Sequence, residues 1–221
     1  MAGQAGELKA SAYLYRTDTY SWSMSNAESF GVQGDTCRVD ILTVGYVEPG
    51  VAGTVVLVRE DDLIAVVDPG MVSGRDKILG PLESLGVKVT DVTDVVLSHH
   101  HPDHTVNVAL FPEARVHDFQ AAYKADDWYS REAEGVRLSN SVYLIETPGH
   151  TPQDISVGFE TSDGLVVYTH LWWDSDGPAE DPYSEDRSVL AASRRRILDL
   201  HPSWIIPGHG SAFVPNESTP I

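Results

Sequence analysis

The sequence of 221 residues carries 33 acidic and 15 basic side chains, which gives a formal net charge of −18. Hydrophobic residues make up 42% of the chain, a fraction typical of a folded globular protein and too high for a disordered one. A surface this acidic repels phosphate backbones, so we expect no nucleic-acid partner.

The length suits one sizeable hydrophobic core and is too short for two full domains. No apolar run approaches the roughly 20 residues that a membrane span requires, so we expect no membrane association. The N-terminus lacks a basic segment followed by an apolar one, which argues against a secretory signal. Cys37 is the only cysteine, which excludes an internal disulfide and a thiolate metal site of the finger type. These features predict a protein of the reducing cytoplasm.

The first elements of the chain are an irregular arm and three strands. Residues 1–36 are polar with scattered aromatic side chains, and they predict an N-terminal arm that packs on the body or on a second subunit of a homodimer. The folded domain is expected over 37–221. Alternating apolar and polar residues predict a strand over 38–47, and β-branched runs predict a hairpin over 54–58 and 63–67.

The middle of the chain begins with a predicted helix over 75–85, started or kinked at Pro81 and capped by Gly86. A short apolar run over 94–97 then predicts a buried strand. The elements predicted after it are a helix opening at 105–110, a strand at 114–117, an exposed helix at 118–130, strands at 142–146, 155–159 and 165–169, a helix at 189–200 and a strand at 204–206. Strands and helices mix along the whole length, which predicts one α/β or α+β domain.

The last helix contains the one basic cluster of the chain, Arg194-Arg195-Arg196. We interpret it as a solvated helix face that offsets nearby acidic residues.

Histidines gather in the segment 98–104, with the sequence SHHHPDH, directly after the strand over 94–97. Alternate side chains of an extended segment share a face about 6.6 Å apart, so His99 and His101 can bind one cation. The proline that follows fixes φ and turns the chain, which lets Asp103 and His104 reach a second position beside the first. HxHxDH at a strand end is a specific pattern, and it predicts a metal centre in preference to a solvated polar loop.

Three further histidines, His150, His170 and His209, each follow a predicted strand in a turn region. A packed scaffold presents side chains at strand ends into a cleft, so we expect these three to join the HxHxDH residues. His117 and His201 have no such setting, and we interpret them as ordinary surface or half-buried histidines.

Four segments resemble the motifs of the metallo-β-lactamase fold superfamily: HxHxDH at 99–104, Pro148-Gly149-His150-Thr151-Pro152, Ile206-Pro207-Gly208-His209-Gly210, and the strand Ala65-Val66-Val67 ending in Asp68-Pro69-Gly70. Ser184-Glu185-Asp186, followed by the segments 193–196 and 207–210, is similar to the metallo-β-lactamase domain-containing protein 1 group. The resemblance covers 39–213. It implies an α+β fold, a four-layer αββα sandwich of two mixed β-sheets flanked by helices, with the site at one edge.

The resemblance also implies the metal ligands: His99, His101 and His150 for a first ion, and Asp103, His104 and His209 for a second. Three imidazoles suit zinc and leave an open position for water, whose pKa the metal lowers to about 7. We expect one or two zinc ions, with iron or manganese as alternatives. Asp103 and His104 are the candidate catalytic residues beside that water. Asp68 either fixes a ligand loop through hydrogen bonds or caps a turn.

Two residues depart from the superfamily pattern. His170 stands where an aspartate normally bridges both metals, and an imidazole offers one lone pair where a carboxylate offers two oxygens. Three arrangements are then open: hydroxide alone bridges the two ions, only one metal binds tightly, or the carboxylate of Asp174 or Asp176 takes the bridging position. We favour His170 as a terminal ligand to one metal. Val106 stands where glycine is common, and its side chain is expected to narrow the pocket floor or shift the loop.

These residues favour a metal-dependent hydrolase that acts on an ester, lactone, thioester or amide bond of a small molecule. The alternatives are a nuclease, which the charge disfavours, an iron-dependent persulfide-type dioxygenase, which needs two histidines and a carboxylate, and a metal-binding, non-catalytic ligand-binding protein. Trp172, Trp173 and Tyr183 follow the site in sequence and are candidate walls of a substrate pocket, although such aromatics are more often core.

Overall fold

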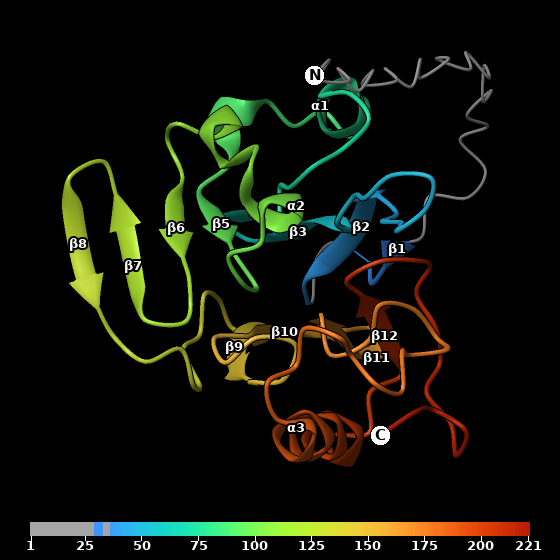
Figure 1. The fold of residues 1–221 in the computed structure, drawn as a ribbon. Helices are drawn as coiled ribbons and strands as arrows, with labels where there is room; N and C mark the ends of the chain where they lie inside the picture. The colour runs from blue at the N-terminus through green and yellow to red at the C-terminus, as the bar shows by residue number, and fades with distance from the viewer. Residues whose placement is uncertain (1–28, 33–35) are drawn as a thin grey trace, which may run out of the picture.

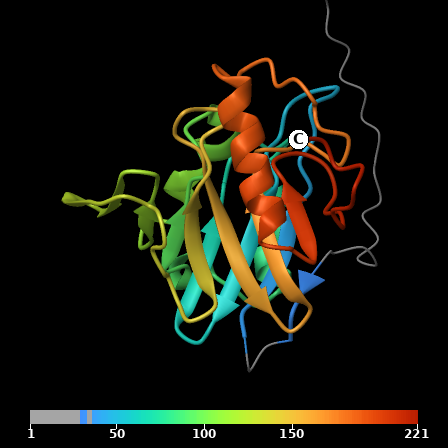
Figure 2. The same cartoon turned by 90° about the horizontal axis from the view of Figure 1, so that it is seen from below.

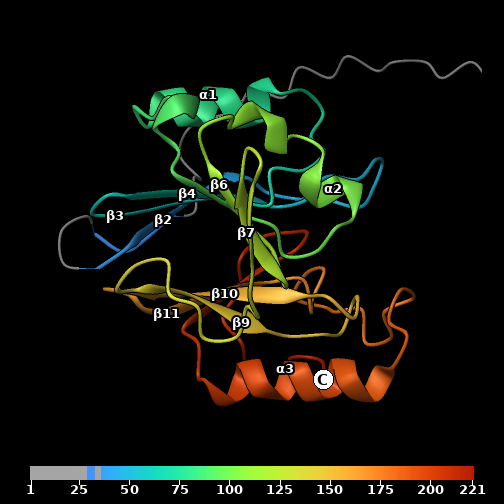
Figure 3. The ribbon, with the colours of Figure 1, turned by 90° about the vertical axis from the view of Figure 1, so that its left-hand side faces the viewer.

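The computed structural model describes residues 29–32 and 36–221 of the chain. Most of the predicted N-terminal arm therefore lies outside the described residues. Two β-sheets lie face to face, and one long helix covers the outer face of each sheet (Figures 1 and 3). The predicted four-layer α+β sandwich is confirmed.

The first sheet has eight strands in the order of the chain, from β1 to β8. Its neighbours are antiparallel except for β4, β5 and β6, which run parallel to one another. The strands are β1 (Ser29–Phe30), β2 (Arg38–Thr43), β3 (Val55–Glu60), β4 (Leu63–Val67), β5 (Asp94–Val96), β6 (Arg115–His117), β7 (Ala121–Lys124) and β8 (Asp127–Ser130).

The second sheet has four strands in the order β12-β11-β10-β9. They are β9 (Val142–Glu146), β10 (Ile155–Thr161), β11 (Gly164–Thr169) and β12 (Trp204–Pro207), and only β11 and β12 pair in parallel. The helices are α1 (Asp76–Ser84), α2 (Pro102–Thr105) and α3 (Arg187–Asp199), with short 3₁₀ helices at Val89–Asp91 and Val108–Leu110. Figure 2 shows α3 lying along the outer face of the second sheet.

The central strands of the sandwich are buried on both faces, and their side chains alternate between the two faces. In β3, Val56 and Val58 point into the core between the sheets, whereas Val55 and Leu57 point outward to the cluster that includes α1. Since successive side chains of a strand point to opposite faces, a strand covered on both sides needs apolar residues throughout. This requirement explains the continuous β-branched runs of the sequence.

The predicted exposed helix over 118–130 is wrong, because this segment forms the hairpin of β7 and β8. The Asp118 carboxylate accepts hydrogen bonds from the backbone N–H groups of Gln120 and Ala121 and turns the chain into β7. Across the hairpin, the Tyr123 and Trp128 rings stack at 5.2 Å between centroids. Such cross-strand aromatic pairs stabilise a hairpin against helical propensity.

Other predicted boundaries shift by a few residues. The strand predicted over 38–47 ends at Thr43, where the pairing of β2 with β3 is irregular. The helix predicted to open at 105 instead begins earlier, as α2 over Pro102–Thr105, and the rest of the predicted segment holds only the 3₁₀ helix Val108–Leu110. Gly86 ends α1 with a positive φ of 73°, as its predicted capping role requires. Within the described ranges, none of the helices has the length and apolarity that crossing a bilayer requires.

Phe159 tests the core between the sheets, because its side chain is fully buried on β10. We expect Phe159→Ala to lower the free energy of unfolding by about 3–5 kcal/mol, since it removes apolar contacts and leaves a cavity. Val214→Ala, at a side chain that is half exposed, is the control and should change it by less than about 0.5 kcal/mol. Denaturant titration measures both, and equal effects would contradict this account of the core.

Candidate metal centre

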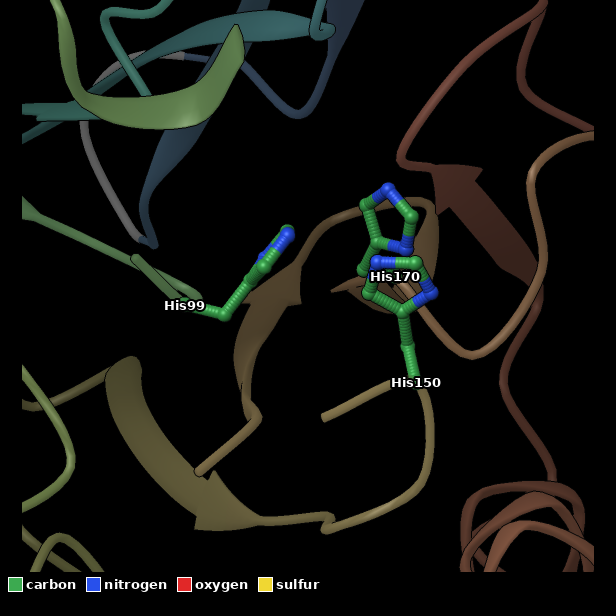
Figure 4. Close-up of side chains that lie close together, drawn as sticks. All are labelled: His99, His150 and His170. Carbon is green, nitrogen blue, oxygen red and sulfur yellow. The ribbon is translucent and has the colours of Figure 1, made fainter. Parts of the chain in front are cut away.

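All seven predicted ligands lie at one edge of the sandwich, where strands from both sheets end. His99 and His101 follow β5, His150 lies between β9 and β10, and His170 and His209 follow β11 and β12. Figure 4 shows His99, His150 and His170 entering the same space from separate segments. The remaining two ligands, Asp103 and His104, lie in α2.

His99, His101 and His150 form one group, which we call the three-imidazole set. His101 Nδ1 lies 3.1 Å from His99 Nε2 and 3.0 Å from His150 Nε2. His99 Nδ1 lies 3.0 Å from Ser98 Oγ, whose own proton goes to Asp68. His99 therefore donates from Nδ1 and carries its lone pair on Nε2.

The tautomer of His150 is fixed in the same way. Its Nδ1 lies 2.7 Å from a carboxylate oxygen of Asp181 and must donate to it, which leaves the lone pair on Nε2. The Nε2 lone pairs of His99 and His150 thus both face His101 Nδ1. Because His101 Nδ1 can donate one proton at most, hydrogen bonding alone cannot satisfy both lone pairs. A tetrahedral zinc with bonds of about 2.0–2.1 Å separates its nitrogens by about 3.3 Å, so the three nitrogens fit a shared cation.

Asp103, His104 and His209 form the second group. Asp103 Oδ2 lies 3.3 Å from His104 Nε2 and 3.6 Å from His209 Nε2. His209 Nδ1 donates to the Ala52 carbonyl oxygen at 2.8 Å, which leaves the lone pair of His209 on Nε2. His104 Nε2 is buried without a hydrogen-bond partner. A bound ion would account for a buried polar atom of this kind among other metal-binding side chains.

The pKa shifts among these residues favour metal binding, except that of His104. Burial and the neighbouring imidazoles lower the pKa of His99, and burial lowers those of His101 and His209. Burial would raise the pKa of Asp103, but the His104 imidazole, 3.3 Å away, lowers it to about 2. Burial would lower the pKa of His104, yet the carboxylates of Asp68 and Asp103 raise it to about 9. A cation binding at Nε2 would therefore displace a proton from His104.

Comparison with known proteins agrees with this geometry. The metallo-β-lactamase superfamily model matches residues 49–137. A metallo-β-lactamase domain-containing protein 1 of Xenopus laevis is 31% identical over 218 residues, which cover 92% of this chain and 93% of the relative. The chain belongs to the metallo-β-lactamase superfamily.

Other members of the superfamily match smaller parts of their own chains. The human metallo-β-lactamase domain-containing protein 1 is 36% identical over 159 residues, which cover 67% of this chain and 58% of the relative. A hydroxyacylglutathione hydrolase of Rhodopseudomonas palustris (strain BisB5) is 35% identical over 102 residues, 43% of this chain and 39% of the relative.

Solved structures of the superfamily share the fold. A metallo-β-lactamase family protein from Thermus thermophilus has a TM-score of 0.63 at 18% identity, over 80% of this chain and 74% of its own. The B. thuringiensis protein AiiA, with N-decanoyl-L-homoserine bound at the active site, has a TM-score of 0.58 at 18% identity, over 82% of this chain and 92% of its own.

His170 occupies the position at which the superfamily resemblance places a bridging aspartate. Its ring is buried, and Nε2 lies 3.2 Å from His209 Nε2. Asp174 and Asp176 are exposed, and the Asp174 carboxylate accepts the backbone N–H of Asp176, so neither replaces the bridge here. Gly208 makes room for the imidazole, because a Cβ there would lie 2.2 Å from His170 Cδ2.

Asp181 is a site residue that the sequence analysis missed. Its carboxylate is buried and accepts hydrogen bonds from His150 Nδ1, from Trp173 Nε1 at 3.0 Å and from the backbone N–H of Tyr183 at 2.9 Å. It lies in an acidic loop, and no local pattern separates it from its acidic neighbours. Its contact with His150 arises only when the chain is folded.

Arg194 corrects a second expectation, because it does not belong to a solvated helix face. Its guanidinium is fully buried and donates to the carbonyl oxygens of Leu171 at 2.7 Å and Pro178 at 2.7 Å. These carbonyls lie on the loop that joins His170 to Asp181. Arg194 therefore holds that loop against α3, while Arg196 is exposed and pairs with an acidic residue as expected.

The expected pocket walls are partly present. The Tyr183 ring lies 5.5 Å from that of His101 and 5.3 Å from that of His150, and Trp173 lies 6.2 Å from His150. Trp172 is instead fully buried in the core beneath α3. Val106 is exposed at the end of α2, so its side chain does not fill the floor of the site.

Asp181 is expected to tune the metal affinity through His150. Asp181→Asn removes the charge that holds the His150 tautomer, so we expect zinc affinity to fall roughly 10–100-fold. Asp174→Asn, in the same loop but exposed, is the matched control and should leave affinity unchanged. Competition with a chromophoric chelator at constant pH measures both, and equal affinities for the two variants would contradict this role.

Proposed function

We propose that the chain is a metal-dependent hydrolase, which uses a metal-activated water to cleave an ester, lactone, thioester or amide bond of a small molecule. The observation that carries the proposal is the three-imidazole set, whose nitrogens converge at 3.0 and 3.1 Å. Three imidazoles without a fourth protein ligand are typical of catalytic zinc. The hydrolase and the homoserine-bound structure among the relatives support this reaction class.

Zinc is the ion that we propose, as one or two per chain. Imidazole nitrogen suits zinc, whereas manganese and magnesium favour sites rich in oxygen. Asp103 supplies the one carboxylate among the seven predicted ligands. The buried Cys37 contacts the carbonyl oxygen of Glu160 and takes no part in the site.

The side chains of the centre have distinct roles in this reaction. A bound divalent ion lowers the pKa of water to about 7 and polarises the substrate carbonyl. The pKa of Asp103 is lowered to about 2, so its carboxylate is ionised at neutral pH and would accept a hydrogen bond from a nucleophilic water held at the centre. Asp181 keeps the proton of His150 on Nδ1 and so keeps Nε2 directed into the site. Tyr183 and Trp173 enclose the bound substrate.

The alternatives find less support among the described residues. The dioxygenase chemistry needs two histidines and a carboxylate, and the three-imidazole set has no carboxylate. Asp103, His104 and His209 do supply such a trio, but His170 adds a third imidazole beside it. The net charge of −18 opposes a nucleic-acid substrate. A small-molecule substrate, a cytoplasmic location and a homodimer stay predictions, as does the absence of nucleic-acid and membrane partners.

Hydrolysis of simple substrates tests the proposal. Protein stripped with a chelator and reloaded with zinc should hydrolyse members of a panel of nitrophenyl esters, lactones and thioesters, and the stripped protein should not. His150→Ala should lose more than about 100-fold in kcat/KM, because the set loses one of its three ligands. Full zinc occupancy without turnover would contradict the proposal and favour a binding protein, and cleavage of RNA would favour a nuclease.

Tyr183 tests the position of the substrate. Its side chain is 60% exposed beside two ligand rings, so we expect Tyr183→Ala to raise KM several-fold, about 1 kcal/mol of lost contact, without changing the zinc content. Tyr129→Ala, which removes an exposed tyrosine on β8, is the control. A Tyr183 variant with unchanged KM across the substrate panel would place the substrate elsewhere.

A further inference from the structure

We infer that His170 joins Asp103, His104 and His209 in a closed set of four donors, while the three-imidazole set alone keeps an open coordination position. The first set, which we call the His170 set, would hold an ion in a structural role. The inference rests on the proposed metal centre but not on hydrolysis. It assigns a structural role to the ion of the His170 set and leaves the open coordination position to the ion of the three-imidazole set.

The orientation of His170 is the first argument. Its Nε2 lies 3.2 Å from His209 Nε2, whose lone pair is free because His209 Nδ1 donates to Ala52. The ring is fully enclosed, and the missing side chain of Gly208 leaves it the room that it occupies. His170 thus presents Nε2 to His209, on the side of the second ligand group.

The other donors of the His170 set face the same point. His104 Nε2 is buried and lacks a hydrogen-bond partner, while its Nδ1 is held by Asp68 at 2.7 Å. Asp103 Oδ2 lies 3.3 Å from His104 Nε2 and 3.6 Å from His209 Nε2. These separations are close to the spacing of about 3.3 Å between ligands of a tetrahedral zinc.

His170 also lies near the three-imidazole set, with donor atoms of His99, His150 and His170 within 4.8 Å of one another. That set, however, already has a third nitrogen, because His101 Nδ1 lies 3.0 Å from His150 Nε2 and 3.1 Å from His99 Nε2. An imidazole has a single lone pair to give, whereas a bridging carboxylate can give an oxygen to each ion. His170 can therefore complete one set and not both.

The donor counts then assign the roles. Zinc sites with four protein ligands are typically structural, and sites with three protein ligands and a water are typically catalytic. The His170 set has three nitrogens and one oxygen, whereas the three-imidazole set has three nitrogens. With no carboxylate shared between them, the two ions should bind and leave separately.

Metal stoichiometry tests the inference without any measurement of activity. The full chain is loaded with zinc, exposed to a chelator for increasing times, and analysed by elemental analysis and native mass spectrometry. We expect wild-type protein to lose one ion quickly and to keep the other. His101→Ala should keep the resistant ion, since it alters the three-imidazole set only.

The decisive variant is His170→Ala. It should lose the resistant ion, with affinity falling by more than the roughly 10–100-fold typical of losing an outer partner. His170→Asp restores a carboxylate that can bridge, so both of its ions should leave together. Thermal unfolding of the metal-free proteins identifies variants that do not fold, and His170→Asn serves if the alanine variant fails.

Two results would overturn the inference. One is a His170→Ala or His170→Asn protein that folds and keeps the resistant ion at wild-type affinity. The other is a His101→Ala protein that loses the resistant ion. A failure of the proposed hydrolase function would be distinguishable, because it would leave both ions bound as described and show no turnover on the substrate panel.

Discussion

One buried carboxylate, that of Asp68, connects the two sheets to the metal-binding segment. It accepts hydrogen bonds from the backbone N–H and hydroxyl of Ser98 after β5, from His104 Nδ1 on α2, and from the Tyr168 hydroxyl on β11. An ionised carboxyl group removed from water is costly unless such donors surround it. Because these donors come from both sheets, the position of the HxHxDH segment depends on the packing of the whole sandwich.

The outer partners of the imidazoles decide what the centre can bind. Ser98, Asp181, Ala52 and Asp68 each bond the Nδ1 atom of one histidine and direct its Nε2 into the site. Partners of this kind fix the tautomer and the orientation of a ligand before the metal arrives. His101 and His170 are the exceptions. His101 turns its Nδ1 into the site, and the Nδ1 of His170 is buried without a partner. The His170 ring is held by packing, and it offers one donor atom where a bridging carboxylate would offer two.

Local patterns in the sequence predict the parts of this structure that depend on local physics. The β-branched runs predict strands buried on both faces, and HxHxDH predicts which side chains meet, because both depend on spacing along the chain. The hairpin of β7 and β8 was missed, since its cross-strand pair of Tyr123 and Trp128 outweighs a helical composition. Asp181 contacts His150 only across the fold. Arg194 was predictable in part: it lies between Leu190 and Ile197 at helical spacing, on the buried face of α3.

Every role assigned to this site requires that imidazoles from separate strand ends share a cation. X-ray absorption at the zinc edge of the reconstituted protein measures this. We expect nitrogen and oxygen neighbours at about 2.0–2.1 Å, outer-shell scattering from at least three imidazole rings per ion, and no sulfur. Zinc surrounded by oxygen without imidazole scattering, or protein that retains no zinc after reconstitution, would show that the imidazoles do not share an ion.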